Sequence, residues 1–457
     1  MKQHKRFHNN RLHRDSKKFN NKRLRRNSGN NGELTIHRAG HVMISPCQII
    51  DNGFISVVNN TIVDVGAVTE TSIIKFSATS GYHSDILNFD KYSKGSKIID
   101  HGSGIIMPSL VNAHTHFELS ALKGKIPFDR GFNQWVRELI NQREQCGAEL
   151  LKLEAKKAIE SAILTGTSLA GEISTLGITE AIFANSDISG VWFQEYLGNE
   201  IEYLESEIAS KAILLALSKT NLELSLKGVF KKIALAGHAP HTTSPALLKL
   251  LKEQTNKLKI PFSIHVAESD DETEFITTGQ GNWANFLKER GIDSSSWQLL
   301  PSRSPVQYLN DIGLLDPLTL AVHLINVDDK DIEIIAKTKA KPIFCPRSNF
   351  NLHKKLPDIP RFLKHGIKPA LGTDSLASTD SINMFDEMLS VATHFPQIAP
   401  SDILAMATIN GANALGFGEM AGTLEKGKKA DFIYVPEVSG NSVSDKIMSI
   451  IEYKSKK

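Results

Sequence analysis

Two histidines separated by one residue end an apolar run that starts at Gly104. They are His114 and His116. Alternate side chains of a strand lie on the same face, so both imidazoles would face one side at the end of this run. Imidazole is a common ligand of zinc and related ions. Two polar residues in a loop can have the same spacing, so the pair indicates a metal site only if further ligands converge on it.

Residues of the same chemical kind follow later apolar runs in the chain. In order they are His238, His241, His265, Glu268, His323 and Asp374. Each alone has an ordinary structural explanation, such as a strand-end histidine or an aspartate that caps a turn. Independent accidents would not place ligand-type residues at the same end of consecutive runs. The set therefore predicts one active site.

The elements that must position these residues are eight apolar runs alternating with longer segments of helical period. This pattern is typical of a parallel sheet in an α/β protein, and eight units predict a (β/α)8 TIM-type barrel over residues 105–390. Such a barrel carries its active site at the carboxyl ends of its strands. The runs are Ile105–His116, Thr167–Glu172, Gly190–Leu197, Ile233–His238, Phe262–His265, Leu318–His323, Pro342–Cys345 and Pro369–Gly372.

The two flanks of the barrel read mainly as short strands. Leu34–His37 and Gly53–Gly66 have strand composition, the latter divided by an Asn-Asn turn, and Gly422–Val435 has a matching pattern. We predict that residues 32–104 and 391–457 pair into one small β-sandwich, with a helix in the second segment. The stretch 67–98 is polar and irregular and predicts only a connection.

Residues 1–31 differ in composition from the rest of the chain. They carry eleven Lys/Arg against one acid, Asp15, although the net charge of the whole chain is only +3. Few apolar residues are present, so we expect a disordered basic tail. A nucleic-acid-binding arm, a transit segment or a misplaced start codon are the alternatives, and nucleic acid is otherwise not an expected partner.

Composition predicts a cytoplasmic protein. No apolar stretch approaches the roughly 18–20 residues of a membrane span, so no membrane association is expected. The three cysteines, Cys47, Cys146 and Cys345, are scattered and lack metal-type spacing, which favours a reducing compartment.

Three imidazoles and one carboxylate suit a borderline divalent ion with one position left for water. Zn²⁺ is the first choice and Fe²⁺ the alternative, while the all-oxygen sites of Mg²⁺ and Ca²⁺ do not match. The fourth run, Ile233–His238, contains no lysine that could be carboxylated to bridge two metals. We therefore expect one ion.

The chain resembles the amidohydrolase superfamily, in its mononuclear deaminase and chlorohydrolase branch, over roughly residues 34–435. The C-terminal stretches Ala407–Gly416 and Gly427–Asp431 add to the resemblance. The stretches that carry it are Pro108-Ser-Leu-Val-Asn-Ala-His-Thr-His116, His238-Ala-Pro-His-Thr-Thr-Ser244, His265-Val-Ala-Glu-Ser269, Leu320-Ala-Val-His-Leu324, Cys345-Pro-Arg-Ser-Asn349 and Gly372-Thr-Asp-Ser375.

The resemblance implies a metal-dependent hydrolase with assigned roles for these residues. Glu268 and His323 would transfer protons, and Asp374 would also hold the attacking water. Glu268 lies an odd number of residues after His265, so it would reach the site from the following loop. From sequence alone His323 could instead be a fifth ligand. The metal ligands would be His114, His116, His265 and Asp374.

The expected reaction is attack of metal-activated hydroxide on a ring carbon, with Glu268 protonating the ring and ammonia leaving. Asn112–Ser120 and Phe132–Trp135 resemble members that deaminate 6-aminopurine nucleosides: aminodeoxyfutalosine, S-adenosylhomocysteine or methylthioadenosine. Phe132 and Trp192 are either base-stacking or core residues, and the role of His241 is open. The predicted substrate-binding residues are His238, Glu118, Trp135, Arg347 and Asn349.

Two alternatives remain. The site could act on another C–N or C–Cl bond, as in guanine or cytosine deaminases, chlorohydrolases or imidazolonepropionase-like enzymes. The protein could instead be a binding module that acts through its basic tail, which predicts salt-sensitive binding of nucleic acid. Relatives also suggest a homodimer acting on a small molecule.

Overall fold

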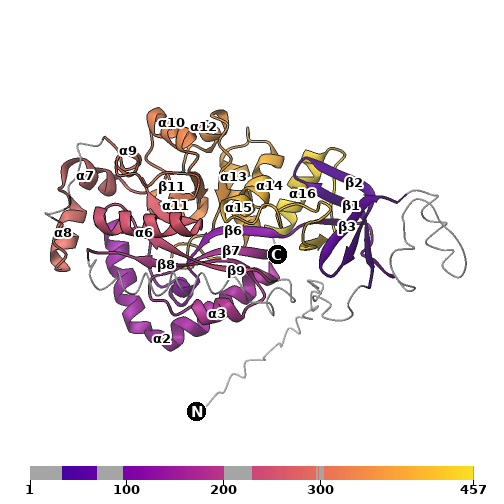
Figure 1. Cartoon of the computed structure of the whole chain (residues 1–457), viewed down its shortest axis with the longest axis horizontal. Coiled ribbons are helices and arrows are strands. Elements are labelled where there is room, and N and C mark those ends of the chain that lie inside the picture. Colours follow the sequence, from indigo (N-terminus) through magenta and orange to yellow (C-terminus); the bar gives the residue numbers. More distant parts are fainter. Residues whose placement is uncertain (1–32, 69–95, 200–228, 295–296, 298–302, 456–457) are drawn as a thin grey trace, which may run out of the picture.

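The computed structural model describes residues 33–68, 96–199, 229–294, 297 and 303–455, and it contains two sheets with helices around the larger one (Figure 1). The predicted tail 1–31 and most of the connection 67–98 lie outside the described residues. None of the helices in the described part of the chain combines the length and the apolar character that crossing a membrane requires.

The larger sheet has eight strands that pair in chain order, all in parallel. A bridge between Thr115 and Asp374 brings the last strand beside the first and nearly closes the barrel. This confirms the predicted (β/α)8 architecture. The strands are β6 (Leu110–Thr115), β7 (Thr167–Ser174), β8 (Ser189–Tyr196), β9 (Lys231–Gly237), β10 (Phe262–Val266), β11 (Thr319–His323), β12 (Lys341–Phe344) and β13 (Ala370–Leu371).

Helices follow most of these strands. Their starts show ordinary capping: Ser244 accepts a hydrogen bond from the backbone N–H of Leu247, and Asp328 forms a capping box with Asp331. The helices are η2 (Phe117–Leu122, 3₁₀), α2 (Phe132–Leu164), α3 (Glu180–Asn185), α6 (Pro245–Leu258), α7 (Asp270–Thr278), α8 (Asn282–Glu289), α9 (Pro305–Asp311), α10 (Asp329–Thr338), α11 (Pro346–His353), α12 (Ile359–Lys364), α13 (Met384–His394), α14 (Pro400–Met406), α15 (Ile409–Ala414) and α16 (Val443–Ser455).

The smaller sheet is built from both flanks, as the sequence predicts, and forms one mixed sheet of six strands. The predicted turn is present: Asn59 and Asn60 have φ angles of 49° and 62°, which asparagine tolerates better than most residues. The sheet order is β14-β5-β1-β2-β3, with β4 also paired to β1. Its strands are β1 (Thr35–Ser45), β2 (Gln48–Val58), β3 (Thr61–Ala67), β4 (Lys97–Asp100), β5 (Ile105–Pro108) and β14 (Phe432–Val435).

One predicted strand is two strands. The run Ile105–His116 divides at Ser109, with β5 in the small sheet and β6 in the barrel. Both halves are apolar because both are buried. Ile106 packs among small-sheet residues and Val111 in the barrel interior, while Ile105, Met107 and Leu110 share a further apolar cluster. A continuous apolar run therefore does not reveal that the chain changes sheets here.

The barrel interior is filled by apolar side chains. Val111, Leu169, Phe193, Val322 and Ile343 belong to this cluster, and each is at most 2% exposed. Interior layers of this kind make a TIM-type barrel a packed core and leave chemistry to its carboxyl end. The polar residues predicted from sequence lie at that end.

Candidate active site

Three buried histidines meet at the carboxyl end of the barrel. His114 lies on β6, His116 follows β6 directly and precedes η2, and His265 lies on β10. The Nε2 atom of His265 lies 3.3 Å from Nε2 of His114 and 3.4 Å from Nε2 of His116. Ligands about 2.0–2.1 Å from one tetrahedral ion are about 3.3–3.4 Å apart, so the three nitrogens have the spacing of a zinc-type site.

The protonation of these histidines fits the same site. Burial, followed by the neighbouring imidazoles, lowers the pKa of His114, His116 and His265 below the ordinary value. The neutral imidazole is the form that binds a metal. The buried Nδ1 atoms of His114 and His116 have no hydrogen-bond partner among the described residues. The cluster therefore suits a divalent cation and not a set of charged imidazoles.

Asp374 lies beside these histidines where the last strand of the barrel meets the first. Its Oδ1 atom lies 3.8 Å from Nε2 of His116, and its backbone N–H donates to the carbonyl of His114 at 3.1 Å. Its φ angle of 57° is in the left-handed region. A Cβ atom on Gly372 would lie 2.6 Å from the His114 carbonyl oxygen, so only glycine permits this close approach.

The ring of His265 is oriented by the backbone. Its Nδ1 atom lies 2.6 Å from the carbonyl oxygen of His238, which can only accept, so Nδ1 carries the proton and Nε2 faces the cluster. Glu195, His238 and His265 also lie close enough together to suggest a second cation site. Because Nδ1 of His265 donates, it is not available there as a ligand. The number of ions stays a prediction.

Glu268 and His323 form a pair beside the histidine cluster. Glu268 follows β10 in a loop, as its offset from His265 predicts, and its Oε1 atom lies 3.7 Å from Nε2 of His323. Ala267 and His323 have positive φ angles of 54° and 78°, a conformation that L-residues adopt mainly where the surrounding structure requires it. Burial would raise the pKa of Glu268, but His323 and His353 outweigh it and hold that pKa well below the ordinary range.

One short helix, α11, contacts all three residues predicted to be catalytic. The Ser348 hydroxyl donates to Oδ2 of Asp374 at 2.5 Å. The Asn349 side-chain oxygen lies 2.8 Å from Nδ1 of His323, and Nε2 of His353 lies 3.1 Å from Oε1 of Glu268. Sequence reasoning missed Ser348 and His353, although Ser348 lies in the conspicuous Cys-Pro-Arg-Ser-Asn stretch.

Glu272 is a second residue that sequence reasoning missed. Its buried carboxyl group accepts the backbone N–H of Ala267 at 2.9 Å and of Glu268 at 2.8 Å, which fixes the loop that carries Glu268. Burial raises the pKa of Glu272 to about 8. The signal was present, since Ser269 and Glu272 have the spacing of a capping box and Ser269 caps α7.

Among the residues predicted to bind substrate, His238 lies nearest the histidine cluster. Its ring centroid is 5.0 Å from that of His265, and its Nδ1 atom lies 2.6 Å from the Thr242 hydroxyl. Asn349 contacts His323, as described above. His241, whose role the sequence left open, is buried with its ring centroid 4.4 Å from that of Trp283.

The other predicted substrate residues have internal contacts. Both carboxylate oxygens of Glu118 accept hydrogen bonds from the end of β7, at Ser174, Thr175 and Leu176. Trp135 is buried in α2 and stacks on Phe132 with ring centroids 6.0 Å apart. Arg347 forms ion pairs with Asp380, Asp386 and Glu387. Trp192 is a core residue whose indole donates to the Thr179 hydroxyl.

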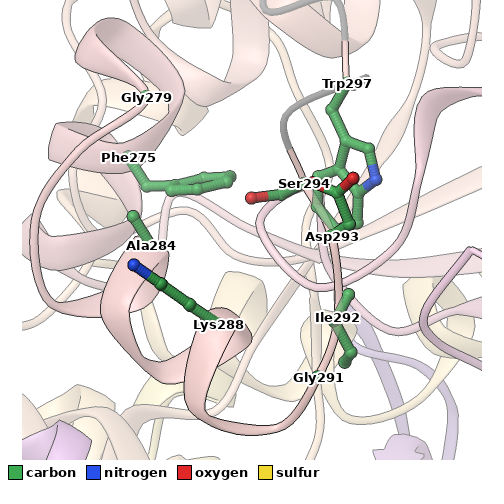
Figure 2. A pocket seen from close by; sticks show the side chains of 9 residues that line it. All are labelled: Phe275, Gly279, Ala284, Lys288, Gly291, Ile292, Asp293, Ser294 and Trp297. Atoms are coloured by element: carbon green, nitrogen blue, oxygen red, sulfur yellow. The ribbon is translucent and has the colours of Figure 1, made fainter.

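A cavity of about 580 Å³ lies elsewhere, against α7 and α8 (Figure 2). Phe275, Ala284 and Lys288 line it from these two helices, and Trp297 lines it from the loop that follows α8. None of the predicted site residues lines this cavity. The predicted site residues therefore lie apart from this cavity.

Residues 105–451 match the model of the amidohydrolase family. The chain belongs to the amidohydrolase family. It is accordingly a metal-dependent hydrolase that acts on carbon–nitrogen bonds, and the histidine cluster is its candidate metal site.

Named relatives of this amidohydrolase are deaminases. A 5-methylthioadenosine/S-adenosylhomocysteine deaminase of Thermoanaerobacter pseudethanolicus is 30% identical over 351 residues, which are 75% of each chain. An aminodeoxyfutalosine deaminase of Deinococcus radiodurans is 29% identical over 69% of this chain and 75% of that protein.

Solved structures show the same fold. The Helicobacter pylori aminofutalosine deaminase in complex with methylthio-coformycin has a TM-score of 0.74 at 22% identity, covering 92% of this chain and 96% of that one. A triazine hydrolase variant has a TM-score of 0.69 at 17% identity, covering 92% and 90%. At these identities the likeness concerns the architecture alone.

Proposed function

We propose that this amidohydrolase deaminates a 6-aminopurine nucleoside and releases ammonia. The observation that carries the proposal is the Glu268–His323 pair beside three converging histidines, because deamination needs both an activated water and a group that moves its proton. The named relatives favour aminodeoxyfutalosine, S-adenosylhomocysteine or methylthioadenosine as the substrate.

The proposed cofactor is one divalent ion, with Zn²⁺ preferred and Fe²⁺ as the alternative. His114, His116, His265 and Asp374 would hold it. When bound, such an ion lowers the pKa of a water ligand from 15.7 to about 7, which makes hydroxide accessible at neutral pH.

The proposed proton path uses residues of the chain. Glu268 takes a proton from the water and delivers it to the purine nitrogen beside the carbon that bears the amino group. His323 and Asp374 orient the water and hold the oxygen that it adds to the ring carbon. The second proton of the water then passes to the amino group, so that the C–N bond breaks and ammonia leaves. Asn349 fixes the His323 ring by accepting from Nδ1, so that Nε2 faces Glu268.

His238 is the proposed contact to the substrate, because it lies beside the cluster at the end of β9. Substrate contacts by Glu118, Trp135, Arg347 and Asn349 stay predictions. The internal hydrogen bonds and ion pairs of Glu118 and Arg347 favour a bracing role for these two. The homodimer and the cytoplasmic location also stay predictions.

The test is ammonia release by purified, metal-analysed protein. The panel contains aminodeoxyfutalosine, S-adenosylhomocysteine, methylthioadenosine, adenosine, guanine and cytosine, each with and without a chelator. Chelator-sensitive release from an adenine nucleoside is the expected result. Release only from guanine or cytosine, or none with one metal bound, would contradict the proposal and favour another leaving group.

A further inference from the structure

His353 is the last residue of α11, and its side chain reaches Glu268. The Nε2 atom of His353 lies 3.1 Å from Oε1 of Glu268, the same oxygen that lies 3.7 Å from Nε2 of His323. An ionised carboxylate only accepts hydrogen bonds, so Nε2 of His353 is the donor. Two imidazoles from different elements thus converge on one carboxylate oxygen.

The other oxygen of Glu268, Oε2, has different surroundings. Across the described part of the chain, no residue donates a hydrogen bond to Oε2, although the Glu268 side chain is about 10% exposed. A terminal carboxylate torsion is soft and rotates unless one of its oxygens is held. The hydrogen bond from His353 therefore makes the two oxygens different. Oε1 is fixed, and Oε2 stays free to accept and release a proton.

His353 is itself held in place. Its side chain is about 8% exposed, and its ring centroid lies 4.6 Å from that of Phe132 at the start of α2. The start of α11 is anchored by a hydrogen bond from the backbone N–H of Arg347 to the Glu387 carboxylate at 3.1 Å. These contacts distinguish His353 from a freely rotating surface histidine.

We propose that His353 is a positioning residue that holds Oε1 of Glu268, so that Oε2 is the oxygen that carries the proton. The inference rests on the proposed function for the role of Glu268. In the step it serves, an O–H bond of water breaks as one forms on Oε2, and the same proton then passes to the ring nitrogen. The proton on His353 stays where it is.

The test compares two substitutions, one without and one with a hydrogen-bond donor toward Glu268. His353→Leu has no donor, whereas His353→Gln keeps an N–H at a similar distance from the backbone. We expect kcat to fall about tenfold in H353L with KM within about twofold, and H353Q to recover to within about threefold of the original rate. His394→Leu makes the same change at an exposed histidine of α13 and should leave kcat unchanged.

Two kinetic outcomes would overturn the inference. One is a kcat of H353L equal to that of the unsubstituted protein, and the other is a kcat of H353Q as low as that of H353L. If H353L does not fold, His353→Asn replaces it, because its amide is one methylene shorter and no longer reaches Glu268. Metal content and Tm are measured for every variant, so that a general loss of structure is recognised.

A second readout does not need activity. Crystal structures of the metal-loaded variants should show the Glu268 carboxylate turned away in H353L and retained in H353Q. An unchanged carboxylate in H353L would contradict the role of His353. If the unsubstituted protein releases ammonia from no compound of the panel, the proposed function fails, while these structures still decide whether His353 positions Glu268.

Discussion

The three histidines proposed to bind the metal and the Glu268–His323 pair proposed to transfer protons lie side by side but are held in different ways. His114 and His265 lie on strands, His116 directly follows β6, and backbone hydrogen bonds or strand pairing fix their positions. Glu268 and His323 instead receive their orientation from side chains of α11 and from the buried carboxyl group of Glu272. The comparison teaches that the three histidines and Glu268 depend on different supports, although α11 also contacts the fourth proposed ligand, Asp374, through Ser348. Loss of the Glu268 carboxylate should therefore leave the histidine cluster intact.

The largest effect is expected from removing a metal ligand. His116→Ala should lose the bound ion and lower the deamination rate on the order of a thousandfold or more, because water without a metal keeps a pKa near 15.7. Metal analysis and ammonia release measure both. His365→Ala, at an exposed histidine that ends α12, is the matched control. Full metal occupancy in H116A would remove His116 from the site.

A smaller loss of rate is expected from a substitution that removes proton transfer but leaves the proposed metal ligands unchanged. Glu268→Gln keeps the shape of the side chain but cannot take up a proton, so we expect an unchanged metal content and a rate at least about 100-fold lower. The same two measurements apply. Near-normal turnover would refute the role of Glu268, and loss of the metal would show that the supports are not separate.

The smallest effect concerns the support of Glu268 and its pH dependence. Burial raises the pKa of Glu272 to about 8, above its ordinary value of 4.5, so the folded protein keeps a proton that the unfolded chain has lost between these values. The contribution of Glu272 to the free energy of unfolding is fully present below pH 4.5 and is lost as pH rises through 8. It declines by up to about 1.4 kcal/mol per pH unit.

Urea unfolding at pH 5.5, 6.5 and 7.5 measures this slope. The free energy of unfolding should fall more steeply with pH in the original protein than in Glu272→Gln, which does not titrate. Other buried carboxyl groups with raised pKa values, such as Glu387 at about 7, contribute to both proteins and cancel in the comparison. Equal slopes would show that Glu272 is ionised throughout this range.

The barrel and the approach of the histidines could be predicted from the sequence because both follow from strand periodicity. Side chains two apart share a face, and the carboxyl ends of parallel strands meet at one end of the barrel. His114, His116 and His265 can therefore be grouped from the order and spacing of residues alone. The offset of Glu268 likewise predicts a loop position, which the structure has.

The contacts of α11 could not be predicted in the same way. Ser348, Asn349 and His353 reach three different residues because of where one short helix lies on the barrel end, and helical spacing alone does not define that position. The internal hydrogen bonds of Glu118 could not be predicted either. A carboxylate near the first ligands reads as a binding group until its donors at the end of β7 are known.

The division of the first apolar run has a consequence for how the chain is assembled during synthesis. β5 pairs with β14 (Phe432–Val435), and only Ser109 separates β5 from β6, which bears His114 and is followed directly by His116. During synthesis, the two histidines are therefore made about 320 residues before β14, the strand that pairs with β5. The pairing of β5 with β14 therefore cannot form until residues 432–435 have been synthesised.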